Sequence, residues 1–219
     1  MPAIGREGRV TMRDVWTTKA LAGWAAPLQR WFEVLDQYRD AASSGPDVAY
    51  WYNERATLST LAGALWLSGC MVLEEYRTVR GGDGSLAPGR ADLWCKIGAA
   101  EYTVEAKQGP KLSYPAKHET LASWADLQLA AASAQCITDN YGGTNRLAMV
   151  FIVPSLRELP TDATLTKWME AIRSFNADLK ASYLDANEPQ AKTATAKGRF
   201  FPGVVLLARL VPRAEPLDE

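Results

Sequence analysis

The segment RADLWCKIGAAEYTVEAKQ, residues 90–108, decides the predicted fold. Polar and apolar residues alternate on both sides of Gly98-Ala99, and a glycine at the first central position is typical of a two-residue type II′ turn. The segment is therefore predicted to form a β-hairpin. One face of this hairpin carries only apolar or semi-apolar pairs: Ala91 with Ala106, Leu93 with Val104, Cys95 with Tyr102, and Ile97 with Ala100. That face is predicted to belong to the core.

The other face of the hairpin is polar. Its cross-strand pairs are Lys96 with Glu101, Trp94 with Thr103, Asp92 with Glu105, and Arg90 with Lys107. Directly opposed carboxylates have Cβ atoms ~5 Å apart, and at an effective dielectric of 20 their repulsion is on the order of 3 kcal/mol. A divalent cation between Asp92 and Glu105 would offset this repulsion, since Mg²⁺ prefers carboxylate oxygens. Alternatively, the face is solvated and Arg90 and Lys107 neutralise the two acids crosswise.

Glu54 lies on the apolar side of a predicted helix at residues 48–68. Leu58, Leu61 and Leu65 recur at spacings of three and four, and Glu54 precedes Leu58 by four residues, so it projects from the apolar stripe. A carboxylate that faces a core is costly unless it is paired or bound to a metal. Glu54 is therefore either an ion-pair partner of an arginine at the rim of the core or a third acidic group that reaches toward the hairpin. The candidate arginines are Arg55, Arg77 and Arg80.

The rest of the chain predicts an α/β (α+β) fold with a mixed central sheet flanked by helices. We expect about five strands, at residues 71–80, 90–97, 101–108, 147–154 and 200–210. We expect helices at residues 12–39, 48–68, 118–139 and 162–184, with a break near Pro27 in the first. Residues 1–219 are expected to form a single domain, with an N-terminal helical extension at 12–40 and an α/β core at 48–210.

The overall charge argues against a protein that binds nucleic acid through a net positive charge. Lys and Arg total 24 and Asp and Glu total 25, which gives a formal net charge of −1. An anionic partner must therefore be held by a local patch or by a bound cation. The three cysteines lack the spacing of a zinc site. No apolar run approaches the ~18–20 residues of a membrane span and no secretory signal is visible, so we expect a cytoplasmic protein with no membrane partner.

These residues together resemble the motif of the PD-(D/E)XK nuclease superfamily, whose members have the restriction-endonuclease-like fold. The matching elements are Asn53-Glu54-Arg55 on the leading helix, Gly89-Arg90-Ala91-Asp92 on one strand and Glu105-Ala106-Lys107 on its hairpin partner. The resemblance covers about residues 48–155 by element order, with Ala91 in place of the proline that names the motif. It implies a metal-dependent nuclease that hydrolyses phosphodiester bonds, with DNA as the expected substrate.

The resemblance also implies a role for each matching residue. Asp92 and Glu105 would bind Mg²⁺ or Mn²⁺, Lys107 would position or activate the attacking water, and Glu54 would assist metal binding. The expected catalytic residues are Asp92, Glu105, Lys107 and Glu54, and the expected metal ligands are Asp92, Glu105 and Glu54. The candidate substrate-binding residues are Arg90, Gln108, Lys111 and Lys117. Gln108 extends the tripeptide and is a candidate contact to the metal-bound water or to a phosphate.

A second hypothesis is an interaction module that keeps the nuclease-like fold without cleaving nucleic acid and binds protein or nucleic acid instead. In that case the N-terminal helical region would be the docking surface. The same region, with Trp16, Trp24 and Trp31, is a candidate interface for a homodimer.

Overall fold

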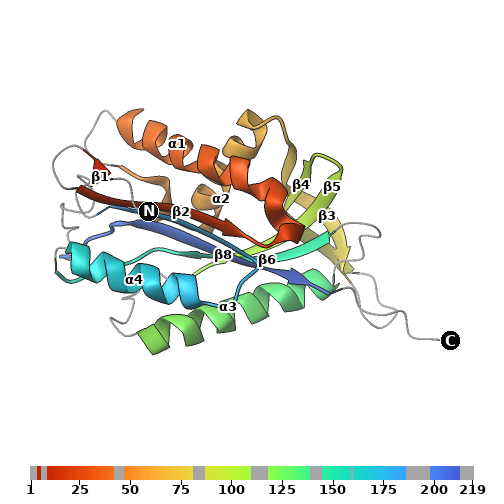
Figure 1. The fold of residues 1–219 in the computed structure, drawn as a ribbon. Coiled ribbons are helices and arrows are strands. Elements are labelled where there is room, and N and C mark those ends of the chain that lie inside the picture. The colour runs from red at the N-terminus through yellow and green to blue at the C-terminus, as the bar shows by residue number, and fades with distance from the viewer. Residues whose placement is uncertain are drawn as a thin grey trace.

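A mixed β-sheet with helices on both faces forms the centre of the structure (Figure 1). The structure is a computed structural model, and it describes residues 4–5, 9–41, 47–80, 87–109, 118–138, 145–158, 160–185 and 198–212. The strands are β1 (Ile4–Gly5), β2 (Arg9–Thr17), β3 (Met71–Arg80), β4 (Ala87–Ile97), β5 (Ala100–Gln108), β6 (Asn145–Ile152), β7 (Leu179–Asp185) and β8 (Gly203–Val211). The helices are α1 (Ala25–Ala41), α2 (Glu54–Leu67), α3 (His118–Thr138) and α4 (Asp162–Ser174), with 3₁₀ turns η1 (Lys19–Trp24) and η2 (Ala49–Trp51).

The sheet is wider than the sequence predicted. Within the described residues its strand order is β1-β2-β7-β8-β6-β5-β4-β3, in which the seven strands β2 to β8 are extended by the two-residue β1. The mixed α/β class is confirmed, but the expected number of about five strands is wrong because β2 and β7 were assigned to helices. β3, β4, β5, β6 and β8 lie where strands were expected, with ends that differ by up to three residues.

The two missed strands lack a clear two-residue period because both of their faces contact the core. On β2, Met12 packs against one hydrophobic cluster and Val15 against the other. On β7, Leu179 and Leu184 belong to different clusters in the same way. Burial on both faces of β7 removes the alternation by which a half-buried strand is recognised, and in β2 the side chains of residues 12–17 are half-buried or exposed on both faces, so it shows no clear alternation either. The helices predicted at residues 12–39 and 162–184 are therefore wrong over their first and last parts, respectively.

Helices α1 and α2 cover one face of the sheet, and α3 and α4 cover the other (Figure 1). The strands β5 and β6 are parallel and are connected through α3, as a parallel pair requires a crossover. Among the described helices, none is long and apolar enough to cross a membrane.

The N-terminal segment is an integral part of the core and not a separate helical extension. Trp24 and Trp31 are fully buried, and Trp31 donates a hydrogen bond from Nε1 to Thr60 Oγ1 at 2.8 Å. These two rings therefore cannot supply the dimer surface that the sequence suggested, whereas Trp16 on β2 is half exposed with Lys180 Nζ 4.8 Å from its ring centroid. Pro27 is the third residue of α1, which follows η1 directly, so the helical segment changes from 3₁₀ to α at Ala25, near the predicted break.

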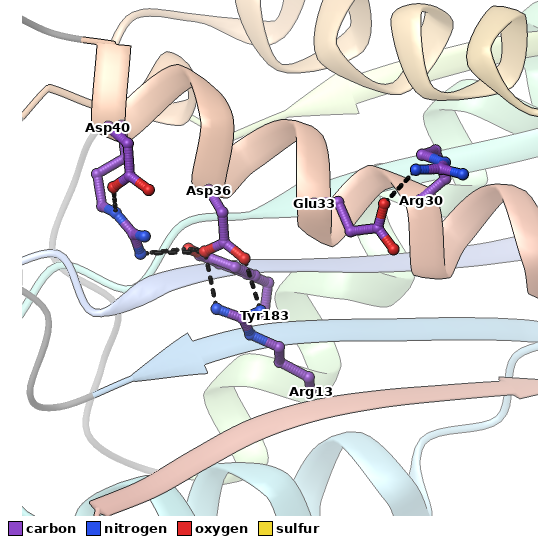
Figure 2. A network of polar contacts seen from close by, with 7 residues as sticks. Arg13, Arg30, Glu33, Asp36, Asp40 and Tyr183 are labelled. Carbon is purple, nitrogen blue, oxygen red and sulfur yellow. Dashed lines mark hydrogen bonds and ion pairs between the residues drawn. The ribbon is translucent and has the colours of Figure 1, made fainter. Parts of the chain in front are cut away.

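A polar network fastens α1 to strands β2 and β7 (Figure 2). Arg13 on β2 donates two hydrogen bonds to the carboxylate of Asp36 on α1, at 2.6 and 2.7 Å. Tyr183 on β7 donates its hydroxyl to the same carboxylate at 2.7 Å and accepts a hydrogen bond from Arg39 at 3.2 Å. Burial raises the pKa of the Tyr183 phenol, and the bond to Asp36 adds to this effect. The network stabilises the neutral phenol and keeps α1 on the sheet.

Replacing Trp31 by alanine is expected to lower the free energy of unfolding by about 3–5 kcal/mol, because it empties a core position and leaves the Thr60 hydroxyl without its donor. The matched control is Trp66→Ala, since Trp66 is 56% exposed. We expect the control to change stability by about 0.5 kcal/mol or less. Urea unfolding followed by far-UV circular dichroism measures both variants, and equal losses would contradict the placement of Trp31.

Candidate active site

The predicted hairpin register is confirmed at the turn end, where five pairs form from Ile97–Ala100 to Leu93–Val104. Beyond Leu93 the two strands separate. β4 continues in contact with β3 to Ala87, and β5 continues in contact with β6 to Gln108. The sheet therefore forks between β4 and β5, and we call the place where their pairing ends the fork.

The fork overturns three of the predicted cross-strand pairs. Ala91 with Ala106, Asp92 with Glu105, and Arg90 with Lys107 are not paired in the β4–β5 ladder. Two of these are pairs of like charge, and direct opposition of two carboxylates costs on the order of 3 kcal/mol. Separation of the strands avoids this repulsion without requiring that a cation lie between the two acids. Asp92 also has no partner in the β3–β4 ladder, which skips from Glu74 to Tyr76.

Three charged side chains bond to the edge of β5 from which β4 has separated. Asp92 Oδ2 accepts a hydrogen bond from the N–H of Ala106 at 2.8 Å, and Lys107 Nζ donates to the carbonyl of Ala106 at 2.9 Å. Glu54 Oε2 accepts from the N–H of Gln108 at 2.7 Å. Backbone polar groups that leave a ladder need other partners, and these side chains provide them. Three of the four predicted catalytic residues thus converge on two residues of one strand.

Glu54 reaches β5 from the first turn of α2. The helix is capped by Asn53, whose Oδ1 accepts the N–H of Ala56 at 3.0 Å. Burial raises the pKa of Glu54, while the Gln108 N–H and Lys107 oppose that rise and Asp92 adds to it. Of the two alternatives for Glu54, the structure therefore favours the acidic group near the hairpin. The guanidinium of the neighbouring Arg55 pairs with Glu75 instead.

The side chain of Gln108 connects β5 to the start of α2. Its Oε1 accepts a hydrogen bond from Thr57 Oγ1 at 2.6 Å, and its Nε2 donates to the carbonyl of Tyr50 at 3.1 Å. Gln108 thus helps to hold Glu54 in place, whereas the sequence suggested a contact with water or phosphate. Thr57 was missed as a part of this site; the available signal was a hydroxyl on the apolar face of the helix.

Glu105 is the most buried of the four predicted catalytic residues, with 1% of its surface exposed. It lies on β5 beside Ala148 of β6. In the part of the chain that the structure describes, no three His, Cys, Asp or Glu side chains are grouped closely enough to hold a metal ion. The predicted ligands Glu54, Asp92 and Glu105 are therefore not gathered into one three-carboxylate group.

The predicted substrate-binding residues lie in different situations. Arg90 is 54% exposed at its side chain and makes an ion pair with Glu75 at 3.1 Å. Gln108 is engaged with α2, as described above. Lys111 and Lys117 lie outside the described residues.

Replacing Glu54 by glutamine is expected to stabilise the protein at neutral pH in the absence of divalent cations. The pKa of Glu54 is higher in the folded protein than its ordinary value of 4.5, so ionisation of Glu54 favours unfolding. The gain should be absent at pH values well below 4.5 and should grow as the pH rises through the folded pKa. Urea unfolding of both proteins between acidic and neutral pH measures it. Glu170→Gln, at an exposed position, is the control, and a gain that does not depend on pH would contradict the burial of the Glu54 charge.

Known proteins do not add to this description. A scan against protein-family models and searches of curated proteins and of solved structures found no match to the chain. The geometry of the fork is thus the basis on which a function is proposed.

Proposed function

We propose that the protein is a metal-dependent nuclease that hydrolyses phosphodiester bonds, with DNA as its substrate and the fork as its active site. One observation carries the proposal: Asp92, Lys107 and Glu54 bond to Ala106 and Gln108 at the edge of β5 that β4 leaves, with Glu105 in that strand. Residues that only closed a sheet edge would not need two carboxylates and an ammonium group there. Charged groups of opposite sign, held together in a partly buried place, are typical of catalytic sites.

The element order supports the proposed relationship to the restriction-endonuclease-like fold. From α2 to β6 the chain forms a helix, three antiparallel strands, a helix and a further strand. This is the order on which the resemblance to the PD-(D/E)XK superfamily rests.

The carboxylates fit the ligand chemistry of Mg²⁺ or Mn²⁺. Mg²⁺ is commonly held by one or two carboxylates together with waters and substrate phosphates, so a group of three acids is not required. Among the described residues, Asp92 and Glu54 each use one oxygen to accept a backbone N–H, and the structure gives no hydrogen bond to the other oxygen. Asp92 and Glu54 would hold the ion, with Glu105 nearby. A bound ion would supply Lewis-acid polarisation of the phosphate and a water of lowered pKa.

Lys107 is positioned to act on the reacting groups. Its ammonium is fixed by the carbonyl of Ala106, the residue whose N–H fixes Asp92. An ammonium held there would orient the attacking water and stabilise negative charge that develops on the phosphate oxygens.

One observation favours the alternative of a module that does not cleave. The carboxylates of Asp92 and Glu54 already have backbone partners, and the described residues contain no group of three metal-ligating side chains. In that case the three side chains would serve only to complete the edge of β5. The two functions differ in what a divalent cation does to the protein.

The first test is cleavage of DNA in the presence of Mg²⁺ or Mn²⁺. We expect Asp92→Asn and Lys107→Met each to lower the rate by about 10²–10³-fold, because each removes charge stabilisation from the reacting groups. Lys96→Met is the matched control, since Lys96 lies in the same hairpin and pairs with Glu101 at 3.3 Å. The control should keep its activity. Cleavage that survives both substitutions at the fork, with unchanged melting temperatures, would contradict the proposal.

The second test is calorimetric titration with Mn²⁺. Wild-type protein is expected to bind the ion and to gain stability by mass action, about 2.7 kcal/mol at a concentration 100 times Kd. Asp92→Asn should weaken this binding at least tenfold. If the wild-type protein does not bind Mn²⁺ at millimolar concentrations, the module that does not cleave is the correct interpretation.

A further inference from the structure

Beside the fork, two arginines share one carboxylate. Arg55 Nε pairs with Oε1 of Glu75, and Arg90 Nη1 pairs with Oε2 of the same residue at 3.1 Å. Both arginine side chains are more than half exposed, whereas the glutamate side chain is 31% exposed. Two guanidinium groups thus share one carboxylate at the surface.

The cluster is built from the elements that carry the fork. Arg55 follows Glu54 in α2, and Arg90 precedes Asp92 by two residues in β4. Glu75 lies in β3 between Glu74 and Tyr76, and Asp92 lies in β4 between the partners of those two residues. Neither Glu75 nor Asp92 is paired in the β3–β4 ladder. Each arginine is therefore close in sequence to a carboxylate that bonds to the edge of β5.

The backbone of Glu75 is strained. Its φ is +48°, and it is the one non-glycine residue with a positive φ in the described part of the chain. A residue with a long side chain rarely adopts this conformation, and such strain is retained mainly at functional sites. A glycine at this position would avoid the strain but would supply no carboxylate to the arginines.

We propose that Arg55 and Arg90 bind a backbone phosphate of the nucleic-acid substrate and that Glu75 occupies this site in the free protein. The inference rests on the proposed function and identifies a phosphodiester as the group that is recognised. Guanidinium groups bind carboxylate and phosphate oxygens with the same planar geometry, so a phosphate can take the position of the Glu75 carboxylate. Exposed ion pairs are weak, so little is lost when the carboxylate leaves. A phosphate at this place would lie next to the residues of the fork.

The test is the affinity for a fluorescently labelled DNA duplex, measured by anisotropy in EDTA over a range of salt concentrations. Arg55→Met and Arg90→Met should each weaken binding, and the double variant should reduce the magnitude of the slope of log K against log salt by about 0.9, the value for one phosphate contact. Glu75→Gln should strengthen binding severalfold, since the competing carboxylate is removed. Glu75→Gly, which also relieves the positive φ, should do the same and guards against a folding defect in the glutamine variant.

The matched controls are Arg30→Met and Glu33→Gln, which alter an exposed ion pair on α1 (Figure 2). They change the net charge by the same amounts and should leave the affinity unchanged. Controls with effects as large as those of the cluster variants would show a general charge effect and overturn the inference. Arginine variants that bind as well as wild type, or a wild type and a Glu75→Gln variant that both fail to bind, would also overturn it. Failure of the proposed function would be seen separately, as wild-type protein that does not cleave DNA with Mg²⁺ or Mn²⁺.

Discussion

The hydrogen bond from the Ala106 N–H to Asp92 is the interaction on which the arrangement of the site depends. Where β4 leaves β5, backbone groups of β5 lose their ladder partners and must be bonded in another way. Asp92 replaces the carbonyl that β4 would have presented, and Lys107 and Glu54 satisfy neighbouring groups. The fork can thus stay open in a folded protein because charged side chains complete its edge. The same bonds fix those side chains in position for chemistry.

Charge balance around the fork follows from this arrangement. Burial raises the pKa of Glu54, the Gln108 N–H and Lys107 lower it, and Asp92 raises it. Further out, Glu75 pairs with both Arg55 and Arg90. The net charge of −1 is therefore compatible with a surface that binds phosphate, because acids and bases are distributed locally around one opening. What the net charge excludes is strong binding of nucleic acid by overall charge alone.

Much of the fold was predictable because it follows from local patterns of polar and apolar residues in the sequence. The alternation around Gly98 predicted the register of the hairpin, the apolar spacing predicted α2 and α4, and the alanine-rich composition of residues 118–139 predicted α3. β2 and β7 were not predicted, since both contact two clusters and so lack alternation. Trp24 and Trp31 fitted a helical spacing, but that spacing did not show that the preceding residues 12–17 form a strand. Because both rings are buried in the core, they cannot form an interface with a second copy of the chain.

The sequence by itself determined the hairpin, the face on which Asp92, Glu105 and Lys107 lie, and the inward direction of Glu54, since each follows from a period of two or 3.6 residues. The tertiary structure decided where the β4–β5 ladder ends and which groups the four side chains contact. It also decided that Gln108 bonds to α2 and that Glu75 joins Arg55 to Arg90. The physical reason is that the point of strand separation depends on repulsion and hydrogen bonding among three strands and a helix. The periodicity of one of these segments does not show where the other three lie.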